Sequence, residues 1–134
     1  MKRVLFDTNV LLDVVLARPP HLADSARALD AVATGAVQGF VAAHAVTTIF
    51  YLLEREVGGG RAKAILGGLL GPLTVAPVTD AGVRMALAGP LADFEDGVTL
   101  AAAAEVNADV IVTRNGRDFL GGGIAAVHPG LLMP

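Results

Sequence analysis

Apolar residues along the chain follow two alternating patterns. Short apolar runs bounded by Asp, Gly or Pro predict buried strands. The expected strands cover Lys2–Phe6, Val37–Ala42, Leu73–Val78 and Asp109–Thr113, with Ile124–Val127 as an optional fifth. Longer segments with apolar residues near the helical period predict helices at Val10–Ala17, His21–Thr34, His44–Val57, Arg61–Leu70, Asp80–Ala88 and Asp93–Val106. Strands that alternate with helices predict an α/β fold, a central parallel sheet of four to five strands with helices on both faces.

Composition limits the class of protein further. A chain of 134 residues, 54% of them hydrophobic, predicts one globular domain over residues 1–134 and excludes a disordered polypeptide. The chain has no Cys, which excludes disulfides and zinc thiolates. No segment reaches the ~18 uncharged apolar residues of a membrane span, so we expect no membrane contact and a cytoplasmic location. A net charge of −3 argues against a general nucleic-acid coat but allows local binding of nucleic acid.

Polar residues follow the ends of two expected strands. Asp7 comes directly after the first strand, and Asn115 and Asp118 follow the fourth. In parallel α/β sheets the first strand is usually central, and ligands bind at the carboxyl ends of strands near the switch in strand order. If the two strands are neighbours, these side chains converge on one crevice. The competing interpretation is that Asp7 forms an Asx-turn and the later residues form an ordinary polar loop.

A third acidic group stands at the start of the Ala-rich helix. The segment Asp93-Phe94-Glu95-Asp96 places three acids in four residues. Helix capping explains one or two of them, because acids suit helix N-termini. It explains three less well, since like charges this close repel unless a cation offsets them. Clustered carboxylates suit Mg²⁺ or Mn²⁺, which take oxygen ligands and can activate water for attack on a phosphodiester. Other nucleophile motifs are absent from the chain.

These segments resemble the PIN-domain family over almost the whole chain, from Val4 to about Val127. The resemblance rests on Phe6-Asp7-Thr8-Asn9-Val10-Leu11-Leu12-Asp13, on Asp93-Phe94-Glu95-Asp96, and on Asp109-Val110-Ile111-Val112-Thr113-Arg114-Asn115 followed by Asp118-Phe119. It is closest to the VapC-like toxins, which are compact PIN domains. It implies a metal-dependent endoribonuclease, a toxin that cleaves single-stranded RNA, forms a homodimer and is neutralised by a cognate antitoxin covering the acidic crevice.

The resemblance also implies roles for individual residues. Asp7, Asp96 and Asp118 match the catalytic, metal-binding acids, and Asn115 stands where many members have a further acid. Asp93, Thr8, Asn9 and Thr113 match supporting positions around these acids. Arg114 and Arg117 flank the expected site and suit phosphate contact, whereas Arg18 is better explained as solvated surface.

One departure from the family pattern concerns the helix after the second strand. Many PIN domains carry a Glu there, and in this chain Thr48 occupies that position, with no obvious replacement in Glu54 or Glu56. His44 lies one turn before Thr48 on the same face and is a candidate substrate ligand or an ordinary helix-start residue. Neutral residues at positions 48 and 115 keep open a catalytically inactive PIN fold that binds RNA or protein.

Two other classes of protein also begin with a strand followed by Asp. A phosphatase of the haloacid dehalogenase type needs a second Asp two residues after the first, where this chain has Asn9, and a later Lys. No Lys follows Lys63, which also argues against a phospho-receiver domain.

Overall fold

A computed structural model describes residues 1–134. Five parallel strands form one sheet in the spatial order β3-β2-β1-β4-β5. The strands are β1 (Arg3–Phe6), β2 (Gln38–Ala42), β3 (Leu73–Ala76), β4 (Val110–Val112) and β5 (Ala125–Val127). The predicted parallel sheet is confirmed, with the optional fifth strand present and β1 in the centre.

Six helices connect these strands. They are α1 (Thr8–Val15), α2 (Leu22–Ala33), α3 (Ala43–Val57), α4 (Gly59–Leu70), α5 (Asp80–Ala88) and α6 (Phe94–Glu105). Two short 3₁₀ helices follow β4 and β5, η1 (Gly116–Phe119) and η2 (Pro129–Leu131). No helix is long and apolar enough to cross a membrane.

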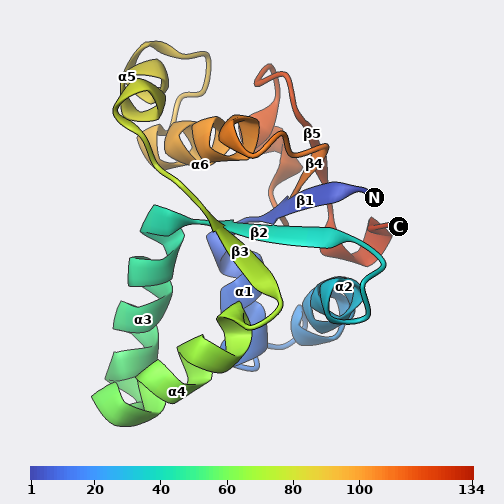
Figure 1. Ribbon diagram of the computed structural model, residues 1–134, viewed down its shortest axis with the longest axis vertical. Helices are drawn as coiled ribbons and strands as arrows, with labels where there is room; N and C mark the ends of the chain where they lie inside the picture. The colour runs from blue at the N-terminus through green and yellow to red at the C-terminus, as the bar shows by residue number, and fades with distance from the viewer.

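The sheet separates two apolar cores, one on each face (Figure 1). Successive side chains of a strand point to opposite faces, so Val4 and Phe6 of β1 enter one core and Leu5 enters the other. Helices α1 to α4 cover the first core, and α6 covers the second with Ala102 and Ala103. Both faces are therefore covered, which is why the strands carry continuous apolar runs.

Helix α5 packs on α6 through small residues. A Cβ on Gly97 would lie 3.0 Å from the Cβ of Ala86, and a Cβ on Gly82 would lie 3.2 Å from the Cβ of Ala101. The close approach of the two helices therefore depends on glycine at both positions. Helix α5 is capped by Thr79, whose hydroxyl accepts a 3.0 Å hydrogen bond from the Gly82 amide.

Two further apolar stretches of the sequence, Ile49–Leu53 and Leu66–Leu73, lie in α3 and across the end of α4 and the start of β3. Ile49 and Leu53 are fully buried, and Leu69 and Leu73 are 7% and 8% exposed. All four belong to the larger core. Packing within one chain therefore accounts for these residues, and they provide no separate evidence of an interface.

Candidate functional site

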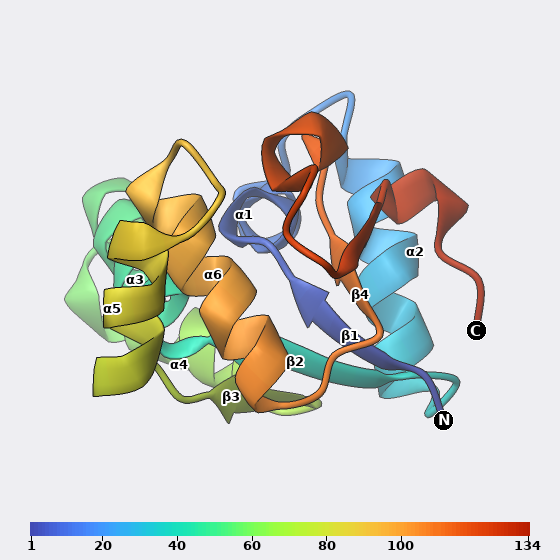
Figure 2. The same cartoon turned by 90° about the horizontal axis from the view of Figure 1, so that it is seen from above.

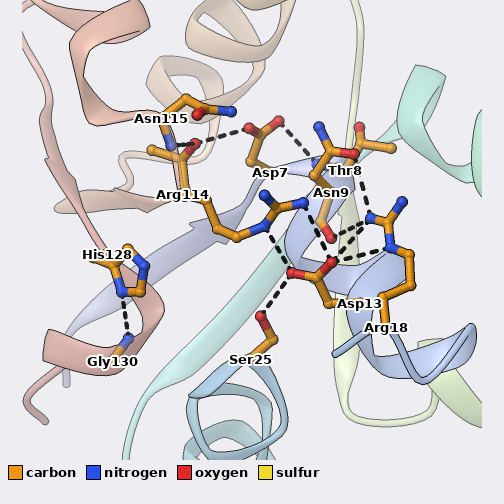
Figure 3. Close-up of polar contacts among 11 residues, drawn as sticks. Asp7, Thr8, Asn9, Asp13, Arg18, Ser25, Arg114, Asn115, His128 and Gly130 are labelled. Atoms are coloured by element: carbon orange, nitrogen blue, oxygen red, sulfur yellow. Dashed lines mark hydrogen bonds and ion pairs between the residues drawn. The ribbon is translucent and has the colours of Figure 1, made fainter. Parts of the chain in front are cut away.

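The register of the two central strands places Asp7 beside Thr113. Phe6 of β1 pairs with Val112 of β4, so the next residue of each strand emerges at the same sheet edge. The Thr113 hydroxyl donates a 2.9 Å hydrogen bond to Oδ2 of Asp7, and the Thr8 amide donates one of 2.9 Å to Oδ1 (Figure 3). Asp7 is thus both the N-cap of α1 and an immobilised carboxylate at the end of the central strand. Thr8 itself is buried below it.

The segment after β4 bends around the same edge. The backbone amide of Asn115 donates a 3.1 Å hydrogen bond to the Thr113 hydroxyl, and Asp118 lies in the exposed turn η1. Figure 2 shows α1 starting at the end of β1, between α6 and the segment that follows β4. This arrangement is the convergence that the strand order predicts.

Only one of the acids at the start of α6 caps the helix with its side chain. Asp93 is the N-cap, and its Oδ1 accepts a 2.9 Å hydrogen bond from the Asp96 amide. The Asp96 carboxylate accepts no hydrogen bond from the Asp93 amide, so a full capping box does not form. The Asp96 side chain is therefore available to the crevice.

The carboxylates from these segments interact through their charges. Burial, followed by repulsion from Asp93, Asp7, Asp118 and Glu95, raises the pKa of Asp96 from 3.8 to about 6. Burial is also the main cause that raises the pKa of Asp7; repulsion from Asp118 adds to it, while the hydrogen bonds from Thr113 and Thr8 and the charge of Arg114 oppose it. The charges of Asp7 and Asp118 therefore act on Asp96 from nearby, although the three residues belong to different segments.

A hollow of about 310 Å³ opens beside these acids. Its lining combines Asp93, Asp96 and Asp118 with Arg117 and the apolar side chains of Leu91 and Leu120. None of the four ion pairs in the protein involves Arg117. A second hollow of about 350 Å³ between α5, α6 and the 122–124 segment is lined only by apolar residues and glycine. The first hollow is therefore the one with the means to bind a charged ligand.

His44 lies in the first turn of α3, within the charge field of Asp7 and Glu95. Its Nε2 lies 3.2 Å from the Thr99 hydroxyl of α6, and its Nδ1 is buried without a hydrogen-bond partner. Burial lowers the pKa of His44, while the charges of Glu95 and Asp7 oppose that shift. Thr48, at the position of the family Glu, uses its hydroxyl within the helix, donating a 3.4 Å hydrogen bond to the His44 carbonyl.

A polar network that sequence reasoning missed lies behind Asp7. The Asp13 carboxylate on α1 is fully buried and receives hydrogen bonds from Arg114, Arg18 and Ser25 (Figure 3). Arg18 also donates to the carbonyl of Asn9 at 3.1 Å. Arg18 is therefore a structural residue rather than solvated surface, and the guanidinium of Arg114 is already paired. The sequence did contain a signal for this network, since Asp13 stands among apolar residues in a short helix. A charge buried there requires hydrogen-bonding or oppositely charged partners.

The side chains as placed do not form a group of three or more His, Asp or Glu residues close enough to hold a metal ion. Their chemistry nevertheless fits a hard divalent cation, which keeps several waters and needs few direct carboxylate ligands. Burial is the main cause of the raised pKa values of Asp7 and Asp96, and the repulsion from neighbouring carboxylates that adds to it is one that a cation would relieve.

A parallel α/β sheet with acids gathered at the ends of its two central strands defines a class of small domains built around a carboxylate site. The family model described as PIN domain matches residues 3–117. The chain therefore belongs to the PIN-domain family. No curated protein matches the sequence.

Solved structures with the same fold include three from toxin–antitoxin systems. VapBC from Salmonella typhimurium, bound to DNA, has a TM-score of 0.71 at 19% identity, covering 96% of this chain and 99% of that chain. The Mycobacterium tuberculosis toxin VapC20, a sarcin–ricin loop cleaving toxin, has a TM-score of 0.70 at 18% identity, with coverage of 92% and 98%. VapBC2 from Rickettsia felis, bound to promoter DNA, has a TM-score of 0.68 at 14% identity, with coverage of 94% and 98%.

Proposed function

We propose that this protein is a VapC-like toxin, a Mg²⁺- or Mn²⁺-dependent endoribonuclease that cleaves single-stranded RNA. The observation that carries the proposal is that Asp96 and Asp118, from two separate segments, line a hollow that also contains Arg117, with Asp7 near enough for its charge to raise the pKa of Asp96. Membership of the PIN-domain family and the fold shared with a toxin that cleaves RNA support it.

Different residues of the chain would bind the ion and contact the substrate. Asp7, Asp96 and Asp118, with Asn115, would hold the ion directly or through water, and Asp93, Thr113, Thr8 and Asn9 support them. When bound, a divalent ion supplies charge neutralisation at a phosphodiester and activates water. Asp7 is held in place for this task by the hydrogen bonds from Thr113 and Thr8.

Substrate contact falls to the groups that remain unpaired. Arg117 suits a phosphate, because its guanidinium lies in the hollow and forms no ion pair. His44 as a substrate ligand stays a prediction, since its Nε2 lies 3.2 Å from the Thr99 hydroxyl and its Nδ1 is buried. Arg114 as a substrate ligand stays a prediction, since Asp13 already holds its guanidinium. A cognate antitoxin covering the hollow and a homodimer complete the proposal, and both come from the likeness to VapC-type proteins.

The experiment is cleavage of a mixed pool of single-stranded RNA with Mg²⁺ or Mn²⁺, for the wild type and for Asp7→Asn and Asp96→Asn. Asp30→Asn is the matched control, because it removes an exposed acid on α2. We expect cleavage that depends on metal, persists in the control and is lost in both site variants.

A catalytically inactive PIN fold is the second candidate. The neutral residues Thr48 and Asn115 favour it, as does the absence of a ready group of three metal-binding side chains. Wild-type protein that cleaves no better than its Asp7→Asn and Asp96→Asn variants, yet binds RNA or a partner tightly, would replace the nuclease proposal with this binding function.

A further inference from the structure

Asp13 is a charged residue in the apolar face of α1. Its side chain is fully buried, and its two oxygens accept hydrogen bonds from three different segments. Arg114 donates from Nε to Oδ2 at 2.8 Å and from Nη2 to Oδ1 at 3.3 Å. Arg18 donates from Nε to Oδ1 at 3.1 Å, and Ser25 donates to Oδ2 at 3.1 Å.

The Arg114 contact ties the site to α1 at a second point. Arg114 lies between Thr113, whose hydroxyl bonds the Asp7 carboxylate, and Asn115, whose amide bonds the Thr113 hydroxyl. Figure 3 shows the Arg114 side chain reaching from this segment to Asp13, beside the contacts of Asp7. The segment after β4 is therefore fastened to α1 at Asp7 and again six residues later at Asp13.

A simple contribution to stability does not explain this choice of residues. Buried ion pairs are weak stabilising devices, because the cost of desolvating both charges offsets most of their attraction. A two-pronged contact between Arg and a carboxylate instead fixes the orientation of the guanidinium, and with it the backbone that carries the Arg. Arg114 is also more enclosed than Arg18, with 20% against 36% of its side chain exposed.

We infer that Asp13, acting through Arg114, is a positioning residue that holds the segment 113–118 where Thr113, Asn115 and Asp118 can serve the site at Asp7. The inference rests on the proposed function for its chemistry. It assigns the Asp13–Arg114 pair to the geometry of the ion site rather than to the grip on RNA.

The test compares Arg114→Met with Arg18→Met, which removes the other arginine from the same carboxylate. Free Mn²⁺ is titrated by electron paramagnetic resonance, kcat and KM are measured on single-stranded RNA, and unfolding temperatures are recorded. Residues that orient metal ligands typically cost 10–100-fold in affinity or activity when they are replaced, so we expect Arg114→Met to weaken Mn²⁺ binding by about tenfold or more. We expect kcat to fall to a similar extent with KM for RNA unchanged, and Arg18→Met to remain within about twofold of wild type.

Three results would overturn the inference. A raised KM in Arg114→Met with unchanged kcat and Mn²⁺ affinity would make Arg114 a substrate ligand. Equal losses in both variants, in proportion to their unfolding temperatures, would leave Asp13 with a purely structural role. Wild-type protein that binds no Mn²⁺ would remove the ion site itself.

The nuclease proposal fails separately from this inference. Wild-type protein that binds Mn²⁺ without cleaving RNA, and loses that binding in Arg114→Met alone, would support the positioning role and reject the nuclease. If Arg114→Met does not fold, Arg114→Lys takes its place, because it keeps the charge beside Asp13 but has no planar fork. Intermediate Mn²⁺ affinity in Arg114→Lys is then the expected result, and wild-type affinity contradicts the inference.

Discussion

The Thr113 hydroxyl donates a 2.9 Å hydrogen bond to Oδ2 of Asp7, and this contact joins the carboxyl ends of the two central strands. Thr113 is 1% exposed, and Thr113→Val would remove both this donor to Asp7 and the acceptor of the Asn115 amide. We expect a loss of about 1.5–3 kcal/mol in the free energy of unfolding, as for hydrogen bonds to charged groups. Because this bond lowers the pKa of Asp7, the pKa of Asp7 should rise further in the variant.

Chemical denaturation and a carboxyl NMR titration would measure the two effects of Thr113→Val. Thr113→Ser is the matched control, since it keeps the hydroxyl and removes only a methyl group. A Ser variant that behaves like the Val variant would show that packing, rather than the hydrogen bond, stabilises this position.

The raised pKa of Asp96 predicts a pH-dependent stability. The folded protein takes up this proton at about pH 6 and the unfolded chain near 3.8, so the folded state binds more protons between these values. Ionising Asp96 therefore destabilises the fold as the pH rises from 3.8 through 6. Asp96→Asn should be more stable than wild type at pH 7 by about 1 kcal/mol, a figure reduced because Asp96 is partly exposed to solvent.

Unfolding measurements across pH 4–8 test this effect, and the advantage of Asp96→Asn should disappear toward the acid end. Asp30→Asn controls for the loss of one negative charge from the surface. A wild type as stable as Asp96→Asn at every pH would contradict the raised pKa of Asp96.

Divalent ions should stabilise the folded protein if they bind at the acids. Binding only to the folded state adds about 2.7 kcal/mol when the free ion is at 100 times its Kd. We expect Mn²⁺ to raise the unfolding temperature of wild type, EDTA to reverse the increase, and Asp7→Asn and Asp96→Asn to lose most of it. Equal increases in wild type and Asp7→Asn would place the ion elsewhere.

Replacing Thr48 by Glu tests the departure from the family pattern. The Thr48 hydroxyl bonds only the His44 carbonyl of its own helix, so the substitution breaks no hydrogen bond between elements. A carboxylate at this position should tighten Mn²⁺ binding and raise the rate of RNA cleavage if Thr48 faces the ion. Thr48→Gln is the control of equal size without the charge, and an equal response in both variants would refute a ligand role.

Gly39 in β2 tests the packing on one side of the sheet. A Cβ there would lie 2.6 Å from Cγ2 of Val32 and 2.8 Å from Cδ2 of Leu73, both side chains being buried. Gly39→Ala should therefore cost about 1–3 kcal/mol through overpacking. Gly67→Ala is the contrast, since the exposed helical Gly67 has nothing within 4 Å, and this change should stabilise by roughly 0.5–1 kcal/mol. Denaturant unfolding of both variants measures the difference.

Much of this molecule could be predicted from local patterns. The apolar runs predicted the strands and helices to within two residues of their observed bounds. This works because the residues that face the core recur at the period of the helix or strand that carries them. The alternation of strands with helices predicted the parallel sheet. The ends of the first and fourth strands predicted that Asp7, Asn115 and Asp118 lie at the same edge of that sheet. Helix capping by one or two of the acids at residues 93–96 was also expected, and Asp93 provides it.

The roles of the arginines required the tertiary structure. A pattern of apolar positions marks Asp13 as unusual but does not say which cation will neutralise it. Arg114 reaches it across 101 residues of sequence, and only because β4 pairs directly with β1. Periodicity records which side of each element faces the core, whereas the partner of a buried charge depends on the strand order and register that bring distant segments together. The sequence alone thus determined the elements, the sheet and the acidic residues, and the tertiary structure decided which side chains hold them in place.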